Sequence, residues 1–90
     1  MEREIHIAGV VVYVQPAHLE SVKSCIQSVP GAEVPADNGG GKLIVTLETE
    51  STKRTLDIMD AIRALPGVID VVLVYQHAES ESALEEEVQQ

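Results

Sequence analysis

One short pattern occurs twice in this chain and limits its topology more than any other feature. IQSVPGA at residues 26–32 and IRALPGV at residues 62–68 share an isoleucine, a branched apolar residue and a Pro-Gly pair at equal spacing. Proline cannot continue a helix, and glycine readily adopts the left-handed conformation that ends one. Each copy precedes residues that suit a β-strand. The repeat therefore predicts two β-α-β halves, each with a helix that ends at a Pro-Gly pair.

Apolar periodicity places the other elements around these two joints. Strands are predicted over residues 5–14, 32–36, 42–48 and 69–75, where β-branched residues are frequent. Spacings of three and four residues predict two amphipathic helices. Their buried stripes are Leu19, Val22, Ile26 and Val29 in the first helix, and Leu56, Met59, Ile62 and Leu65 in the second.

Cap and turn residues agree with these boundaries. Pro16 suits the first position of a helix, and Ser51 or Thr52 suits the N-cap of the second helix. The sequence DNGGG at residues 37–41 predicts a hairpin turn that uses positive φ. Pro35 has no N–H group to donate to a neighbouring strand, so its strand is expected at a sheet edge.

The resulting order βαββαβ predicts an α+β fold. Right-handed crossovers place both helices on one face of a four-stranded antiparallel sheet with the spatial order 4-1-3-2, which is the ferredoxin-like sandwich. In this order the strand with Pro35 lies at an edge. Residues 1–76 are expected to form a single domain, and the glutamate-rich residues 77–90 a solvated, disordered tail.

Composition excludes several classes of partner. A net charge of −9, the absence of Trp and Phe, and only two tyrosines argue against nucleic-acid binding. No apolar stretch is long enough for a membrane span, and the N-terminus lacks the pattern of a secretory signal peptide. A single cysteine, Cys25, rules out an internal disulfide. The protein is expected to be cytoplasmic and not inserted in a membrane.

The first strand carries no charge on either face over residues 7–14. We expect Val10, Val12 and Val14 to face the helices, because Gly9 packs poorly and the Tyr13 hydroxyl needs water or a partner. On the other strands Leu43, Val45, Leu47, Ile69, Val71 and Leu73 are expected to face the core. The face without helices then carries Ile7, Val11, Tyr13, Ile44, Thr46, Val72 and Val74, rimmed by Lys42, Glu48 and Asp70. An apolar patch of this kind marks an interaction surface.

No catalytic or metal-binding arrangement is found. His6, His18 and His77 show no metal-ligand spacing, and Cys25 is expected to be a small buried hydrophobic residue. A C-x-x-C pair is absent, and the glycines of DNGGGK join two strands without the spacing of a phosphate-binding loop. We therefore expect a protein that is not an enzyme and that uses no cofactor or metal.

Pattern alone leaves several functions open. The bare face could be covered by a second copy in a weak homodimer or by a foreign ligand. A small-molecule regulatory module of the amino-acid-sensing type shares βαββαβ, although no glycine-rich ligand loop follows the first strand. An acylphosphatase-like enzyme would need an arginine near the first strand-to-helix loop, and VYVQPAHLE has none.

The chain resembles the NapD family over about residues 7–77. The resemblance rests on IxxVPGAEV at the first joint, GGKLIVTLE in the third strand and GVIDVVLVYQH in the last, with a glutamate-rich tail. Members are cytoplasmic chaperones for the catalytic subunit of the periplasmic nitrate reductase.

The resemblance implies a partner for the bare face. Proteins of this family bind the twin-arginine signal peptide of the nitrate reductase precursor across the sheet, and delay its export until cofactor insertion is complete. No family motif fixes which carboxylate meets which arginine. Asp70, Glu48 and Glu33 are the candidates in this chain, because carboxylates pair well with guanidinium groups.

Overall fold

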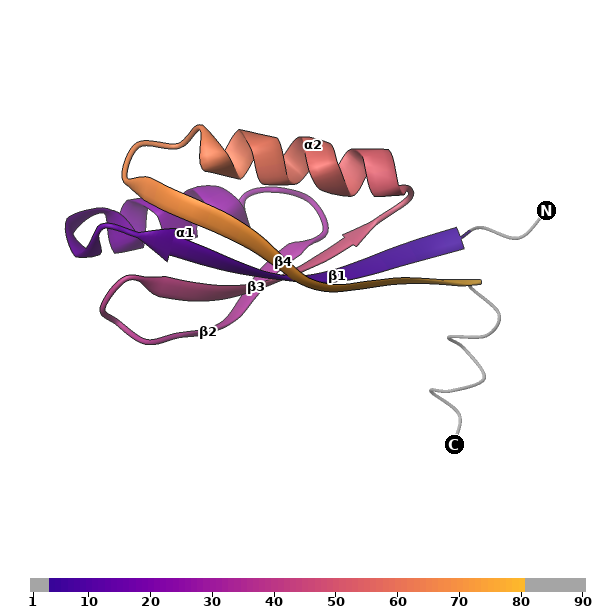
Figure 1. Ribbon diagram of the computed structural model, residues 1–90, viewed down its shortest axis with the longest axis horizontal. Coiled ribbons are helices and arrows are strands. Elements are labelled where there is room, and N and C mark those ends of the chain that lie inside the picture. The colour runs from indigo at the N-terminus through magenta and orange to yellow at the C-terminus, as the bar shows by residue number, and fades with distance from the viewer. Residues whose placement is uncertain (1–3, 81–90) are drawn as a thin grey trace.

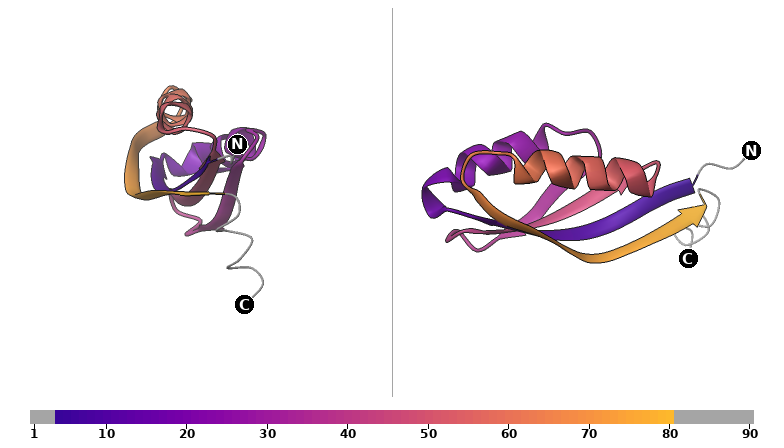
Figure 2. Two further views of the ribbon diagram at one scale, coloured as in Figure 1. Left: turned by 90° about the vertical axis from the view of Figure 1, so that its right-hand side faces the viewer. Right: turned by 45° about the horizontal axis from the view of Figure 1, so that its top comes forward.

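The structure is a computed structural model that describes residues 4–80 of the 90-residue chain. Its elements are β1 (Glu4–Val14), the 3-10 turn η1 (Pro16–His18), α1 (Leu19–Gln27), β2 (Ala32–Asp37), β3 (Lys42–Thr49), α2 (Thr52–Arg63) and β4 (Val68–Ser80). Figure 1 shows the helices as one layer above the sheet, and Figure 2 confirms that both cover the same face.

The sheet has four strands in the order β2-β3-β1-β4, and every neighbouring pair is antiparallel. This is the predicted order 4-1-3-2 read from the other edge, so the predicted fold is confirmed. β2 lies at an edge, and its register with β3 shifts between Glu33 and Ala36, on either side of Pro35. The proline therefore sits where its missing N–H disrupts little pairing.

The two repeated joints have the same backbone geometry. Gly31 has a φ of 85° and Gly67 a φ of 89°, both in the left-handed region that glycine favours. The predicted helix ends are thus confirmed. Ser51 caps α2, and its hydroxyl oxygen accepts a hydrogen bond of 3.0 Å from the Arg54 N–H.

An aliphatic core lies between the sheet and the helices. The predicted inward residues of β1 and β3 are buried, as are Leu19, Val22 and Ile26 of α1. The predicted stripe of α2 is partly wrong, because Leu56 is 48% exposed. The helix instead buries Thr55 beside Ile58, Met59 and Ile62.

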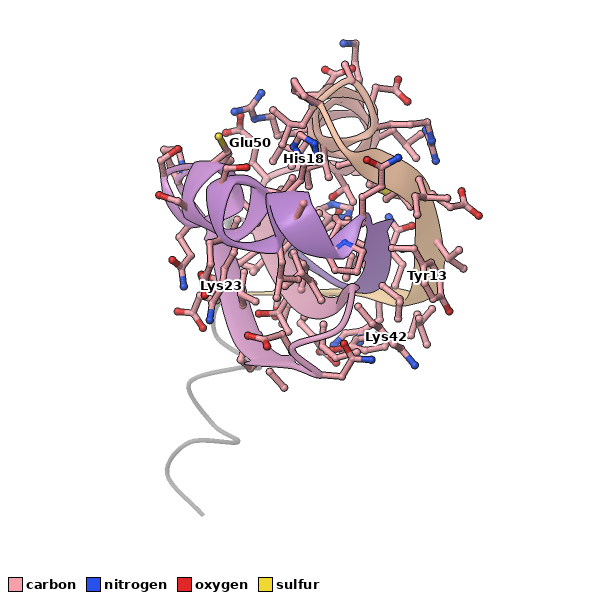
Figure 3. All side chains as sticks on the ribbon, turned by 90° about the vertical axis from the view of Figure 1, so that its left-hand side faces the viewer. Tyr13, His18, Lys23, Lys42 and Glu50 are labelled. Atoms are coloured by element: carbon pink, nitrogen blue, oxygen red, sulfur yellow. The ribbon has the colours of Figure 1, made fainter. Side chains whose placement is uncertain are left out.

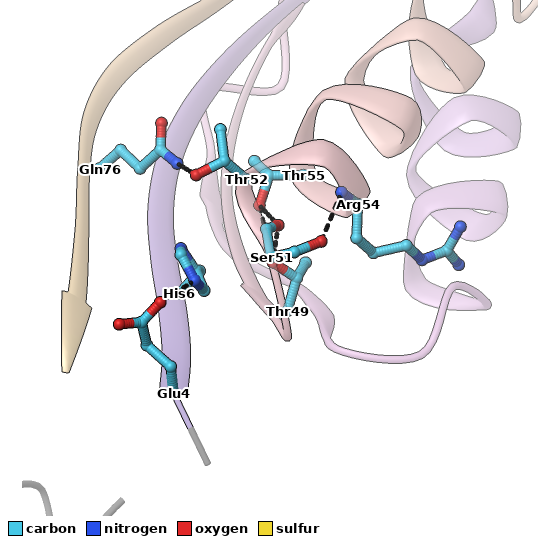
Figure 4. A network of polar contacts seen from close by, with 8 residues as sticks. All are labelled: Glu4, His6, Thr49, Ser51, Thr52, Arg54, Thr55 and Gln76. Atoms are coloured by element: carbon cyan, nitrogen blue, oxygen red, sulfur yellow. Dashed lines mark hydrogen bonds and ion pairs between the residues drawn. The ribbon is translucent and has the colours of Figure 1, made fainter. Parts of the chain in front are cut away.

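Thr55 can occupy the core because its hydroxyl is satisfied there. The Thr55 Oγ1 lies 2.7 Å from the Thr49 Oγ1, and it also donates to the Ser51 carbonyl oxygen at 3.2 Å. Figure 4 shows this network at the start of α2. A buried polar group with hydrogen-bond partners carries little penalty, and a search for apolar stripes alone overlooks such a residue.

β4 departs most from the prediction. The strand continues to Ser80, beyond the predicted end at Tyr75, so residues 77–80 pair with β1 rather than starting a tail. The other residues of the predicted tail, 81–90, lie outside the described residues. The register with β1 shifts twice, which leaves Ile69 and Val74 without a cross-strand partner.

These shifts correct two expected core positions. Ile69 is 65% exposed because it is the extra residue of a bulge and not part of the inward alternation. Leu73 lies opposite the buried Val10 but is 38% exposed, since β4 is an edge strand. Val71 is buried as expected. Cys25, also expected in the core, is exposed on α1.

An ion pair fastens α1 to the end of β2. The Lys23 Nζ donates to the Asp37 carboxylate at 2.9 Å, and Figure 3 shows Lys23 at this edge of the helix layer. The hydrogen bond from Lys23, helped by one from the Gly39 N–H, lowers the pKa of Asp37 below 3.8. The same contact raises the pKa of Lys23 above 10.5.

The ion pair predicts how stability depends on pH. A carboxylate whose pKa is lower in the folded state stabilises the protein above its unfolded pKa, and this contribution disappears as the pH falls through the folded pKa. Asp37→Asn should therefore lower the melting temperature slightly at pH 7, and the difference from the wild-type protein should shrink as the pH falls below 3.8. Thermal unfolding followed by circular dichroism measures this difference. A difference that is independent of pH would contradict the assignment.

Candidate functional site

The face of the sheet away from the helices is the candidate site. The buried residues of β1 alternate from Ala8 to Val14, so the residues between them point to the opposite face. Residues paired directly across strands share a face, which extends the assignment to the other strands. The rows across this open face are Lys42–Tyr13–Asp70, Ala36–Ile44–Val11–Val72, Glu33–Thr46–Gly9–Tyr75, Glu48–Ile7–His77 and Ile5–Glu79.

The middle of the open face is aliphatic. Ile44, Val11 and Val72 stand side by side over three strands, and the next row adds Tyr13. Val72 is 41% exposed and Tyr13 is 39% exposed, although both are large apolar side chains. Within residues 4–80 neither helix covers these rows, because both pack on the other face. The open-face residues along β1 from Ile7 to Tyr13, with Ile44 and Val72 beside Val11, therefore form an apolar strip that no element of residues 4–80 covers.

The structure gathers the predicted site residues with one exception. Ile7, Val11, Tyr13, Ile44, Thr46, Val72, Asp70 and Glu48 all lie in the rows of the open face. Val74 is 62% exposed but is the unpaired residue of the second bulge in β4, so it stands outside the rows.

Tyr75 is the residue of the open face that the alternation in β4 did not predict. Strict alternation from Val71 would place Tyr75 on the face toward the helices. The extra residue Val74 reverses the alternation, so Tyr75 lies on the open face and pairs with Gly9. A Cβ atom on Gly9 would lie 2.1 Å from the Tyr75 Cε1, so the ring rests directly against the glycine backbone. Gly9 was the available signal, since a glycine inside a strand marks a bulge or a close approach.

Gly9→Ala is predicted to displace the Tyr75 ring with little loss of stability. The neighbouring atoms belong to the end of a half-exposed side chain that can rotate away, and Gly9 has no positive φ that would strain alanine. We expect the free energy of unfolding to change by less than about 1 kcal/mol. The Tyr75 ring proton shifts should move, as measured by NMR. Unchanged ring shifts would show that the tyrosine does not rest on Gly9.

The two ends of the open face carry different charges. The Tyr13 end has Lys42 on one side and Asp70 on the other, and the Asp70 carboxylate accepts a hydrogen bond of 2.8 Å from the Val71 N–H. The Ile7 end carries Glu33, Glu48 and Glu79. Among residues 4–80 none of these three glutamates forms an ion pair.

Three of the basic side chains within residues 4–80 are engaged with other carboxylates. Lys23 pairs with Asp37 at 2.9 Å, Lys53 with Asp57 at 3.0 Å and Arg63 with Asp60 at 3.1 Å, all within or beside the helix layer. These three basic side chains therefore form no ion pair with the glutamates of the Ile7 end.

Two hollows adjoin the Ile7 end of the open face. The smaller one, of about 210 Å³, lies on the open face and is lined by Ile7, Thr46, Glu33 and Glu48 with the backbone around Gly31. The larger one, of about 570 Å³, lies where β1 begins and α2 starts, and Glu4, Glu50 and Arg54 line it. Glu48 and Gly31 border both hollows.

These features define a class of protein. The described residues contain no group of three or more His, Cys, Asp or Glu that could hold a metal ion. What they offer is a broad apolar sheet face with one negatively charged end, on an α+β sandwich. Such a surface is typical of domains that bind another macromolecule.

Comparison with known proteins identifies the family. A family model described as NapD protein matches residues 5–80. The chain therefore belongs to the NapD family. It is 26% identical over 81 residues to the Chaperone NapD of Haemophilus influenzae, with 89% of this chain and 87% of that protein covered. The Chaperone NapD of Escherichia coli K12 is 27% identical over 82 residues, with 90% and 94% covered.

Solved structures agree. The solution structure of the Escherichia coli Tat proofreading chaperone protein NapD superposes with a TM-score of 0.76 and 27% identity, over 90% of this chain and 85% of that chain. A transcriptional regulatory protein of the AsnC family from Pyrococcus furiosus gives a TM-score of 0.66 at 16% identity, over 77% of this chain and 49% of that chain. The second likeness shows the fold alone.

Proposed function

We propose that this chain binds the twin-arginine signal peptide of a periplasmic nitrate reductase precursor on its open face, and delays export until cofactor insertion is complete. One observation carries the proposal. An apolar strip runs along β1 from Ile7 to Tyr13, with Ile44 and Val72 beside Val11 on the neighbouring strands. It remains uncovered within residues 4–80, and glutamates that form no ion pair there lie at its Ile7 end.

The chemistry of such a peptide fits this surface. A twin-arginine signal peptide has a basic segment with two arginines followed by a modestly apolar stretch. Apolar side chains of the stretch would remove the strip from water, which favours association. Each guanidinium can donate two parallel hydrogen bonds to a carboxylate, and such charge-assisted pairs are stronger than neutral ones. Both halves of the peptide thus find a matching surface.

The relatives support the same partner. The Escherichia coli protein of the same fold is described as a Tat proofreading chaperone. Proofreading requires contact with the precursor before export, so we place this chain on the cytoplasmic side of the membrane. Neither helix within residues 4–80 is long and apolar enough to cross a membrane.

A titration tests the proposal directly. The isotope-labelled full chain is titrated with a synthetic twin-arginine signal peptide of a nitrate reductase, and the amide shifts are recorded. We expect the largest shifts on the open-face residues of β1, β3 and β4, and their loss when both arginines of the peptide are replaced by glutamine. A saturating peptide that moves no amide would refute the proposal.

The same sample tests the homodimer alternative. Without peptide, the amide shifts are compared over a hundredfold range of protein concentration. Shifts of the open-face residues that follow concentration, together with no response to peptide, would show that a second copy covers the strip.

A further inference from the structure

We infer that the bound peptide has one direction on the open face: its arginines lie at the Ile7 end, between Glu33 and Glu48, and its apolar stretch runs along β1 toward Tyr13. The inference rests on the proposed function and adds the orientation of the partner. β1 runs from right to left in Figure 1, so the glutamate end of the face lies to the right.

Charge complementarity is the first argument. Glu33, Glu48 and Glu79 place three carboxylates at the Ile7 end, and none of them forms an ion pair within residues 4–80. The opposite end presents Lys42 directly across from Tyr13, and Figure 3 labels both residues. A pair of arginines would be attracted to the first end, whereas at the second end Lys42 offsets the negative charge of Asp70. Electrostatic complementarity of this kind mainly fixes the register of a complex and excludes wrong orientations.

The hydrogen bonds of the candidate carboxylates give the second argument. Asp70 already uses one oxygen for the Val71 N–H at 2.8 Å. Within residues 4–80 the side chains of Glu33 and Glu48 have no hydrogen-bond partner, and both line the hollow of about 210 Å³ above Ile7. Glu33 faces Thr46 across β2 and β3, so Glu48 is its diagonal neighbour, typically about 7–8 Å away.

One planar guanidinium can reach two such carboxylates. Arginine presents five N–H donors in a rigid fork, which suits a position between two acceptors better than a point charge would. The larger hollow beside it is less suitable for an arginine, because Arg54 lines it. The smaller hollow on the open face is therefore the arginine site.

The length of the apolar strip is the third argument. From Ile7 to Tyr13 the face extends for about 20 Å, at about 3.3 Å per residue of strand. A helical stretch of about 13 residues, which rises about 1.5 Å per residue, covers this length. The strip can thus accept the apolar stretch that follows the arginines, with Val11, Ile44 and Val72 near its middle.

Paramagnetic broadening measures the direction. Two versions of the peptide carry a nitroxide, one beside the arginine pair and one at the far end of the apolar stretch. A maleimide linkage is used because Cys25 is free and exposed and would exchange with a disulfide-linked label. We expect the first label to broaden the amides of Ile7, Glu33 and Glu48 at least threefold more than those of Tyr13 and Asp70, and the second label to reverse this ratio.

Each outcome is distinguishable. Binding with the opposite pattern, or with equal broadening from both labels, would overturn the direction while leaving the proposed function intact. Absence of any binding would overturn both.

Matched variants provide an independent readout. Glu33→Gln combined with Glu48→Gln should weaken peptide binding at least tenfold by calorimetry, whereas Asp70→Asn should change it less than twofold. The glutamine peptide, which lacks the arginines and should already have lost its affinity for the wild-type protein, should show no further loss with the double variant. A larger loss for Asp70→Asn than for the double variant would place the arginines at the Tyr13 end.

Discussion

Val72→Asp is expected to abolish binding of the twin-arginine peptide while the domain stays folded. Val72 lies beside Val11 in the apolar row of the open face, and 41% of its surface is exposed in the free protein. In the complex the new carboxylate would be covered by the apolar stretch of the peptide. A buried charge without a partner costs several kcal/mol, so the dissociation constant should rise by about a hundredfold or more. Calorimetric titration measures the loss.

Leu56→Asp is the matched control for this variant. Leu56 is also a large apolar residue, 48% exposed, but it stands on α2 in the layer that covers the other face. The same change of charge at a similar exposure should leave peptide binding within about twofold. An equal loss of peptide binding in both variants would point to a general effect on the domain. Full binding by Val72→Asp would remove the open face as the site.

Val11→Asp extends the test to the centre of the sheet. Val11 pairs with Ile44 on one side and Val72 on the other, and it is half-buried in the free protein. We expect the same loss of binding with an added loss of stability. Urea unfolding of both variants separates the two effects, because Val72→Asp should keep nearly the wild-type midpoint.

Local signals were sufficient to predict the topology. The repeated Pro-Gly joints, each followed by a strand, define two β-α-β halves, and Gly31 and Gly67 have the positive φ that this interpretation requires. The edge position of β2 followed from Pro35 alone. These features depend on a few neighbouring residues, so periodicity and turn chemistry are enough to find them.

Register shifts were not predictable from alternation. Two residues of β4, Ile69 and Val74, have no cross-strand partner. Each of these extra residues reverses the alternation of side chains between the open face and the face toward the helices. Branched residues occupy both parities of this strand, so its sequence contains no contrast that would reveal a bulge. Tyr75 was assigned to no face for this reason, although Gly9 opposite it marked the close approach.

The charge asymmetry of the open face also needs the three-dimensional arrangement. The positions of Glu33, Glu48 and Asp70 on the rim could be proposed from strand parity. That Asp37 is neutralised by Lys23, from a separate helix, while Glu48 has no such partner among the described residues, follows only from packing. The sequence thus predicted which carboxylates lie near the face, and the structure distinguishes the free ones from the engaged ones.

Gly31→Ala is expected to be the most destabilising single-methyl change among the variants considered. Gly31 has a φ of 85°, and a Cβ atom there would lie 2.2 Å from the backbone oxygen of Glu48. That oxygen cannot move easily, because the Glu48 N–H donates to the Gly31 carbonyl at 2.8 Å and fixes the two backbones together. Left-handed strain costs about 1–2 kcal/mol and the forced shift about 1–3 kcal/mol, so we expect a loss of about 3 kcal/mol. Urea unfolding measures it.

Gly39→Ala separates the two causes. Gly39 also has a positive φ, of 71°, but no atom lies within 4 Å of the position of an added Cβ. The free energy of unfolding of this variant should fall only by the cost of placing alanine in a left-handed conformation, about 1 kcal/mol. The difference in the free energy of unfolding between the two variants then measures the contact between the helix-to-strand joint and β3. Equal losses of stability would show that the joint tolerates a methyl group. Because that contact holds Glu48 in place beside the proposed arginine site, Gly31→Ala should also weaken peptide binding at temperatures where the variant is folded, whereas Gly39→Ala should not.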